Sequence, residues 1–249
     1  ASFPHHAWGN SDSETGCCAF ASGGRYLWAT VPTFTPEQPL LADDAVWLID
    51  VATRALLDTR RLNVAGAGCH PVHHPDGDTL GLSIGEGQDG SPIRWVRPAR
   101  DHDGQPGSSV RIDLRFAPGD DRVLMDVHPA GHEYLTTPHG SGSWELIRHR
   151  FADDAAIEKL AAPTEFSEED RWDLYAGYLT EDLILASTSD GESERHLLVE
   201  RQPMRLVAAV DYPFDEQAGA FNSPRRGRWL TVGAEGDLHC WVLPGAAAG

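Results

Sequence analysis

The sequence predicts an all-β fold built from five copies of one four-stranded antiparallel unit, and three observations lead to this prediction. The first is the stretch 73–97, where a turn, a strand, a Gly/Asp-rich tip and a second strand follow one another. Its apolar residues Leu80, Leu82 and Ile84 alternate with small or polar ones, which is the pattern of a β-hairpin with one buried face. The second observation is that this unit recurs. The third is that the two chain ends together complete one unit.

Each unit has a turn between its first and second strands, which we call the launching turn, and four of these turns carry a glycine in the equivalent place. These glycines are Gly24, Gly77, Gly131 and Gly227, and Thr180 holds the position in a shortened fourth turn. Successive markers lie 53, 54, 49 and 47 residues apart. The repeat is therefore about 50 residues long, a spacing at which each copy holds one supersecondary unit.

The strands of each unit follow in order along this repeat. First strands are apolar, precede the marker and are expected at 17–20, 68–72, 123–127, 174–178 and 218–221. Second strands follow the marker and end in a tip, which is Gly-rich at 85–90, 139–142, 190–191 and 233–236 and a longer Pro-containing loop at 32–39. Third strands are expected at 45–51, 93–97, 144–149, 196–200 and 238–242, and fourth strands at 55–62, 110–116 and 205–212.

The fourth strand of the third unit, expected around 156–161, competes with a helical pattern. Ile157, Leu160 and Ala161 have helical spacing, and the sequence SEED at 167–170 resembles a helix capping box. Because local propensity is weaker than tertiary context, we expect extended structure at 156–161. The alternative is an inserted helix between the third and fourth units.

The two chain ends supply the strand that the last unit lacks. From Gly227 to the end there are 22 residues and from the start to Gly24 there are 24, which together make nearly one period. We therefore expect the N-terminal segment 2–9 to pair as the outer strand of the last unit, which removes the open edges of a linear array. Five four-stranded antiparallel units of this period predict a five-bladed β-propeller, a single domain of residues 1–249 whose ring is closed by the N-terminal segment.

Several motifs of the chain resemble those of WD-repeat propellers. They are the turns HPDG and HPAG, the tips GEGQDG and GAEGD, and the third-strand endings IRW at 93–95 and HCW at 239–241. Asp50 and Glu200 stand where the terminal Asp of that family stands. The resemblance extends over nearly the whole chain and implies a propeller that serves as a scaffold for protein–protein interaction.

The charge balance restricts the possible partners. The chain has 20 Lys and Arg against 38 Asp and Glu, a net charge of −18. Such a charge repels phosphate backbones and anionic lipids, so we expect binding neither to nucleic acid nor to a membrane surface. No apolar run approaches the ~18 residues of a membrane span, and four cysteines, two of them adjacent, make no disulfide framework. We expect an acidic protein of bacterial type that is cytoplasmic and monomeric.

The twelve histidines raise the question of a metal site. His73, His74 and His128 precede launching turns, and His132 follows one. The spacing H-x-x-x-H occurs at His70/His74 and His128/His132. Each pair spans a proline in a strand or turn context, whereas zinc needs three or four convergent ligands. We expect these rings to hydrogen-bond the backbone of the turns, and we expect no metal and no cofactor.

Three cysteines, Cys17, Cys18 and Cys69, fall on the innermost strands of the first two units among small residues. We expect them to be buried thiols that behave as small apolar side chains. The alternative is a redox pair between Cys17 or Cys18 and Cys69.

The leading hypothesis for function is an interaction scaffold whose variable tips contact a protein or a basic peptide. The residues that the repeat places on this surface, which we call the tip face, are Glu86, Asp89, His139, Asp190, Glu192 and Glu235.

The alternative hypothesis is an enzyme or small-ligand binder, similar to the glycoside hydrolases, with a site in a pocket on the propeller axis. Glycoside hydrolysis needs two facing carboxylates, and two acids lie on predicted innermost strands. The expected lining residues are His70, Arg122, Asp126, Trp172 and Asp173. The sequence contains no nucleophile elbow, phosphate-binding loop or dinucleotide fingerprint, so no catalytic residue is assigned.

Overall fold

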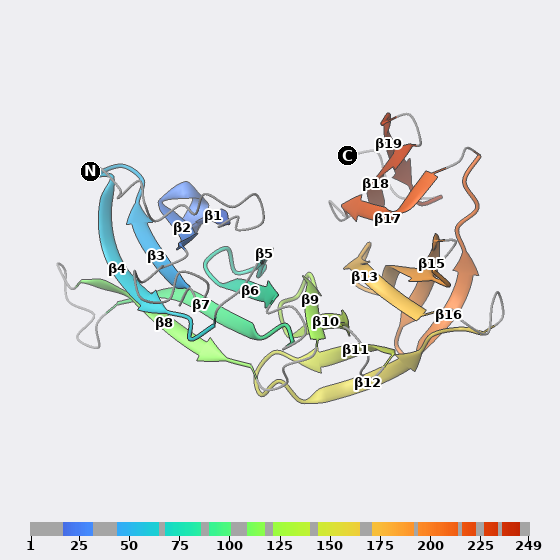
Figure 1. Cartoon of the computed structure of the whole chain (residues 1–249), viewed down its shortest axis with the longest axis horizontal. Helices are drawn as coiled ribbons and strands as arrows, with labels where there is room; N and C mark the ends of the chain where they lie inside the picture. The colour runs from blue at the N-terminus through green and yellow to red at the C-terminus, as the bar shows by residue number, and fades with distance from the viewer. Residues whose placement is uncertain are drawn as a thin grey trace. The chain divides into compact units, whose positions relative to one another are not determined.

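Nineteen strands in five antiparallel sheets make up the part of the chain that the structure describes. Figure 1 shows this computed structural model with its strands labelled. The described residues are 17–31, 44–64, 68–85, 90–100, 109–117, 122–139, 144–164, 171–191, 194–213, 216–222, 227–233 and 236–244. Within each sheet the strands are also neighbours in sequence, so every sheet is a simple meander. The predicted all-β architecture of five antiparallel units is confirmed.

The first two sheets, blade one and blade two, have four strands each. Blade one contains β1 (Cys18–Ala21), β2 (Tyr26–Val31), β3 (Ala45–Asp50) and β4 (Ala55–Arg61), with a 3-10 turn, η2 (Ser22–Gly24), between β1 and β2. Blade two contains β5 (Gly68–His73), β6 (Leu80–Gly85), β7 (Ile93–Arg100) and β8 (Val110–Phe116).

The remaining eleven strands form blades three, four and five. Blade three contains β9 (Arg122–Val127), β10 (Glu133–Pro138), β11 (Glu145–Arg150) and β12 (Ala156–Ala161). Blade four contains β13 (Arg171–Tyr178), β14 (Leu183–Ser189), β15 (Glu194–Arg201) and β16 (Met204–Ala209). Blade five contains β17 (Glu216–Asn222), β18 (Arg228–Gly233) and β19 (Leu238–Val242). Every strand with predicted bounds is present, and its ends differ from the prediction by at most three residues.

Residues 156–161 form strand β12, so the predicted extended structure is confirmed and a helix at these residues is wrong. β12 pairs antiparallel with β11, with Leu160 opposite Leu146. The Leu160 side chain packs against the core of blades three and four, and its carbonyl accepts a 2.8 Å hydrogen bond from the indole of Trp172. Strand pairing and burial therefore outweigh the helical spacing of the segment. The capping-box sequence at 167–170 lies outside the described residues.

The launching-turn glycines share one backbone conformation. The φ angles of Gly24, Gly77, Gly131 and Gly227 are +91°, +76°, +75° and +72°. Glycine adopts this left-handed region without the steric cost that a Cβ imposes. The four glycines that mark the repeat in the sequence therefore share a positive φ angle.

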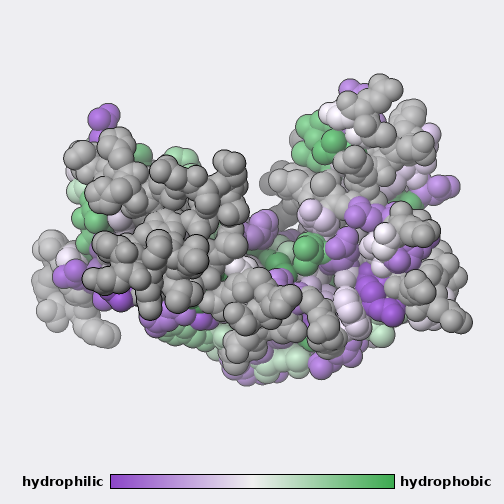
Figure 2. Space-filling view, viewed as in Figure 1, coloured by the Kyte–Doolittle hydropathy of each residue, from purple (hydrophilic) through white to green (hydrophobic). Residues whose placement is uncertain are grey.

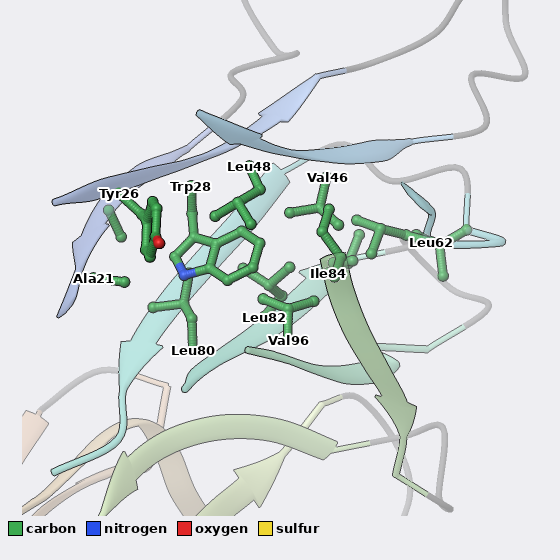
Figure 3. Close-up of a cluster of buried hydrophobic side chains, with 13 residues drawn as sticks. Ala21, Tyr26, Trp28, Val46, Leu48, Leu62, Leu80, Leu82, Ile84 and Val96 are labelled. Atoms are coloured by element: carbon green, nitrogen blue, oxygen red, sulfur yellow. The ribbon is translucent and has the colours of Figure 1, made fainter. Parts of the chain in front are cut away.

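Blades one and two share a hydrophobic core. In Figure 3 the indole of Trp28 from β2 lies among Leu48 of β3 and Leu80 and Leu82 of β6. All four side chains are at most 1% exposed, and Ile84 of β6 is fully buried. The predicted burial of the alternating apolar residues of β6 is confirmed.

The intervening residues of β6 are buried as well, which the alternation does not predict. Gly81 packs against the ring of Trp95, and Ser83 Oγ accepts a hydrogen bond from the N–H of Leu124 in β9. β10 is likewise buried along its whole length. The expectation of a single buried face is wrong for these second strands, because β6 and β10 lie inside their sheets with packing against both faces.

The chain divides into two compact units, Ala1–Leu124 and Met125–Gly249. Each unit has a core of its own, and that of the second is formed between blades three and four. This second core includes Trp172 and Tyr178 of β13 together with Leu135 of β10, which are all at most 2% exposed. No helix among the described residues is long and apolar enough to cross a membrane.

Blade five has three strands in the described part of the chain, where β19 pairs with β18 alone. The segment 2–9, expected as its fourth strand, lies outside the described residues, and ring closure by this segment stays a prediction. The same holds for the expectation that residues 1–249 form a single domain.

Deletion of residues 1–10 tests ring closure. If this segment covers the edge of β19, its removal exposes unpaired N–H and C=O groups. We expect the melting temperature to fall by a few degrees, or the protein to aggregate, as followed by circular dichroism and size-exclusion chromatography. A truncated protein that melts unchanged and stays monomeric would contradict closure across the termini.

Candidate functional site

The tip face is only partly contained in the described residues. Of its six predicted members, Glu86, Asp89, Glu192 and Glu235 lie outside the described residues, and His139 and Asp190 lie within them. His139 follows the end of β10 and is half-buried. The Asp190 carboxylate lies 3.4 Å from Nη2 of Arg195, and its side chain is 17% exposed.

Trp144 lies at the tip end of blade three. The sequence placed it in a strand and gave it no functional role. Trp144 directly precedes β11 and is 42% exposed. The guanidinium carbon of Arg171, the first residue of β13, lies 5.6 Å from the centroid of its ring. An exposed tryptophan stacked with an arginine is the kind of surface group that often anchors a protein partner. The sequence contains one signal for this surface group, which is a large apolar residue directly after a polar Gly/Ser tip.

The five residues expected to line an axial pocket lie on innermost strands. His70 lies on β5 and is exposed, and Arg122 is the first residue of β9 and half-buried. The Asp126 carboxylate accepts two backbone hydrogen bonds at 2.8 Å, one from the N–H of Val127 and one from that of Tyr178. This carboxylate therefore joins β9 to β13, the innermost strand of the next blade.

The remaining two, Trp172 and Asp173, are adjacent on β13. Trp172 is 2% exposed, belongs to the core of blades three and four, and donates its indole N–H to the carbonyl of Leu160. Asp173 is half-buried, and its carboxylate accepts the N–H of Leu174 at 2.7 Å. The contacts of Trp172 are those of a core residue.

His74 and His128, which directly precede the Pro-x-Gly launching turns, contact the turn backbone as the sequence predicts. Nδ1 of His74 accepts the N–H of Asp76 at 3.2 Å, and Nδ1 of His128 accepts the N–H of Ala130 at 3.0 Å. The other ring nitrogen of His128, Nε2, lies 2.9 Å from the carbonyl of Glu181 in the next blade. With Nδ1 accepting, Nε2 carries the proton and donates it. Burial lowers the pKa of His128 and so favours this neutral ring.

One group of residues brings potential metal ligands together. Ligand atoms of His128, His132 and Glu133 lie within 4.8 Å of one another. Both ring nitrogens of His128 are engaged in the hydrogen bonds described above, and zinc needs a free lone pair from each ligand. The Glu133 carboxylate is flanked by the guanidinium groups of Arg148 and Arg201, which oppose a further cation. We therefore continue to expect no metal at this position.

Glu133, Arg148, Arg201 and Tyr178 form a buried polar cluster between blades three and four, which we call the interblade clamp. One carboxylate oxygen of Glu133 lies 3.3 Å from Nη2 of Arg148 and the other lies 3.0 Å from Nη1 of Arg201. The hydroxyl of Tyr178 donates to the second oxygen at 3.3 Å. Burial and the charge of Glu133 raise the pKa of Tyr178 above its ordinary value, so the hydroxyl keeps this proton.

Carboxylates on outer strands join neighbouring blades in a second way. Glu158 of β12 accepts the N–H of Met204 in β16 at 2.7 Å, and it also contacts Nη1 of Arg148 at 3.2 Å. Between blades one and two, Asp58 of β4 accepts the N–H of Ile112 in β8 at 2.9 Å. Both acids follow a β-bulge in their strand. A bulge re-aims the side chains beside it, and here it accompanies a carboxylate directed at the next blade.

The three cysteines of the innermost strands differ in exposure. Cys17 and Cys69 are half-buried and pack against the core of blades one and two, whereas Cys18 is exposed. The expectation that Cys18 is buried is wrong, because it lies on the solvent face of the short strand β1.

The five meanders define the protein as a five-bladed β-propeller. Its structure is similar to that of putative TolB from Agrobacterium tumefaciens, at 12% identity over 93% of this chain and 78% of that chain, with a TM-score of 0.57. It is similar to hydrazine synthase from Kuenenia stuttgartiensis at 10% identity over 98% and 71%, with a TM-score of 0.51. The β-propeller domain of Cps50 (Swd1) from Myceliophteria thermophila matches at 12% identity over 91% and 83%, with a TM-score of 0.39.

No protein-family model matches the sequence, and no curated protein matches it significantly. At identities of 10% and 12%, the likeness to solved structures concerns the fold alone. The predicted propeller is confirmed, and the resemblance to WD-repeat propellers in particular rests on the sequence motifs.

Proposed function

We propose that the protein is an interaction scaffold that binds a protein or a basic peptide at the tip face. The observation that carries this proposal is the net charge of −18 on a chain that also pairs part of its cations internally. At least nine of the 20 Lys and Arg residues form ion pairs within the chain. A partner that approaches such a surface meets a net negative field, which favours cationic ligands and speeds their association.

The geometry of a propeller supports the same proposal. The tips connect second to third strands at one end of each blade, where side chains vary without disturbing the core. Hydrophobic residues also reach the described surface, as the green areas of Figure 2 show. Trp144, at the tip end of blade three, is 42% exposed. In this proposal Trp144 supplies apolar contact area and the tip acids supply charge.

The scaffold would act as a cytoplasmic monomer, without a cofactor and not on nucleic acid or membrane surfaces. The alternative of an axial enzyme site needs Asp126 as an acid. That carboxylate accepts the N–H of Tyr178, a bond that joins β9 to β13 and supports a structural role for this residue.

An oligoarginine peptide is a suitable probe of the tip face. We expect it to bind, to weaken as salt rises, and to bind at least about tenfold more weakly to a Glu86→Lys/Glu235→Lys double variant, measured by fluorescence anisotropy. Those two acids belong to the tips of blades two and five.

The matched control is Asp153→Lys/Glu181→Lys, which changes the net charge equally at the opposite ends of the strands. Both control residues are exposed and lie in turns of blades three and four. An equal loss in both double variants would contradict a specific tip face. If the affinity for the peptide depends neither on salt nor on either double variant, the peptide does not bind the tip face, and the axial residues become the candidate site.

A further inference from the structure

Two free cysteines, one from blade one and one from blade two, lie against each other. Sγ of Cys17 is 3.2 Å from Sγ of Cys69. Cys17 directly precedes β1 and Cys69 lies on β5, so the two sulfur atoms bridge the innermost strands of blades one and two. Because a disulfide bond is about 2.05 Å long, the sulfur atoms need to approach by only about 1.2 Å to form one.

Backbone contacts hold both sulfur atoms in place. The N–H of Cys17 donates to Oγ1 of Thr30 at 2.7 Å, and the N–H of Thr30 donates to the carbonyl of Cys17 at 2.9 Å. Oγ1 of Thr30 also lies 3.3 Å from the sulfur of Cys17. Cys69 is fixed by strand pairing opposite Ile84, a fully buried residue of β6. The pair is therefore positioned by the core and not by a mobile surface loop.

The surroundings distinguish the two thiols. Hydrogen bonds from the Cys69 thiol and the Thr30 hydroxyl lower the pKa of Cys17, although burial opposes this. The same contact with Cys17, together with burial, raises the pKa of Cys69. Since the thiolate is the nucleophile, Cys17 is the sulfur that reacts first, and Cys69 remains protonated until its neighbour has been oxidised.

We propose that Cys17 and Cys69 form a reversible disulfide that fastens blade one to blade two when the protein meets a hydroperoxide. The Cys17 thiolate attacks one peroxide oxygen, the O–O bond breaks, and the product is a sulfenic acid and hydroxide. Cys69 then loses its proton to this hydroxide, which gives the first water, and its sulfur attacks Cys17. The S–S bond forms as the S–O bond breaks, and the departing hydroxide takes up the proton that Cys17 released to become a thiolate, which gives the second water. With hydrogen peroxide, two thiols and one peroxide yield one disulfide and two waters, and two electrons pass from sulfur to oxygen.

This crosslink adds a covalent bond between two sheets whose described contacts include a shared core, hydrogen bonds and the ion pair of Arg111 with Asp58. It closes a loop between residues 52 positions apart, which restricts the unfolded chain. A thiol reductant such as dithiothreitol reverses the bond by exchange. The site is independent of the tip face, so it stands or fails separately from the proposed function.

The test treats the full chain with hydrogen peroxide and maps its peptides by mass spectrometry without reduction. We expect one crosslink, between Cys17 and Cys69, and a melting temperature higher by roughly 5–10 °C than that of the reduced protein. Cys18→Ser and Cys240→Ser keep the crosslink, because both native thiols are exposed and lie outside the pair. Cys17→Ser and Cys69→Ser lose it.

The wild-type protein itself keeps the test decisive if a serine variant fails to fold. Oxidation in denaturant scrambles the pairing among the four cysteines, so the native pairing is a readout of the folded geometry. Oxidation of the folded protein that stops at a sulfinic acid, or that links Cys18 to another thiol, would overturn the proposal. So would a crosslink between Cys17 and Cys69 that leaves the melting temperature unchanged.

Discussion

Replacement of Glu133 by Gln is expected to lower the free energy of unfolding by about 3–5 kcal/mol, because it removes one charge from a buried ionic cluster. Glu133 and Arg148 are 2% and 3% exposed, and Arg201 is 16% exposed. The glutamine amide keeps the shape of the carboxylate but removes the buried charge that both guanidinium groups share, and it leaves Arg148 with the partly exposed Glu158 and Arg201 with the exposed Asp182. For the compact unit Met125–Gly249, which contains Glu133, this loss of stability corresponds to a fall in melting temperature of about 10 °C.

Glu145→Gln provides the matched control, since it makes the same chemical change in a surface ion pair of the same blade. Glu145 lies 3.3 Å from Lys159, and the two side chains are 34% and 52% exposed. Such pairs contribute about 0–1 kcal/mol. Thermal and urea unfolding of both variants measure the difference. Equal, small losses would mean that water reaches the interblade clamp and screens it.

The repeat of the sequence accounts for most of the fold that could be predicted. Glycines with a left-handed backbone are visible in a sequence because other residues adopt that conformation at a cost. Strand β12 is predicted correctly only because the repeat requires it, while its own spacing favours a helix. A period therefore carries tertiary information that a local pattern lacks.

The polar interblade contacts were not predicted and the cysteine contact was only an alternative, although the same period contains a signal for all of them. Asp126 and the Tyr178 amide are 52 residues apart, Asp58 and the Ile112 amide are 54 apart, and the two close cysteines are 52 apart. Neighbouring blades place residues one repeat apart against each other. A search for complementary polar residues at that separation would have singled out these contacts.

Exposure and burial were harder to predict than the strands. Trp144 is exposed and Gly81 is buried, the opposite of what hydropathy suggests for each. The burial of Gly81 follows in part from contact with Leu124, a residue distant in sequence. Alternation along one strand describes the faces of a single sheet, and it does not show that a second blade covers the face carrying small residues.

Gly81→Val is expected to lower the free energy of unfolding by about 3 kcal/mol, the upper range for overpacking a filled core. A Cβ at Gly81 would lie 2.7 Å from Cζ3 of the Trp95 ring and would also collide with Leu124. Trp95 is 2% exposed and Leu124 is fully buried, so neither side chain can move aside freely. The two further methyl groups of valine increase the overlap, and its high β-propensity does not compensate for it.

Gly85→Val is the matched control because it makes the same substitution on the same strand, β6. A Cβ at Gly85 meets nothing within 4 Å, so valine should leave the stability unchanged or raise it slightly. Thermal unfolding should separate the two variants by roughly 6–12 °C. If both variants melt alike, the close approach of Gly81 to Trp95 does not limit the packing of blade two.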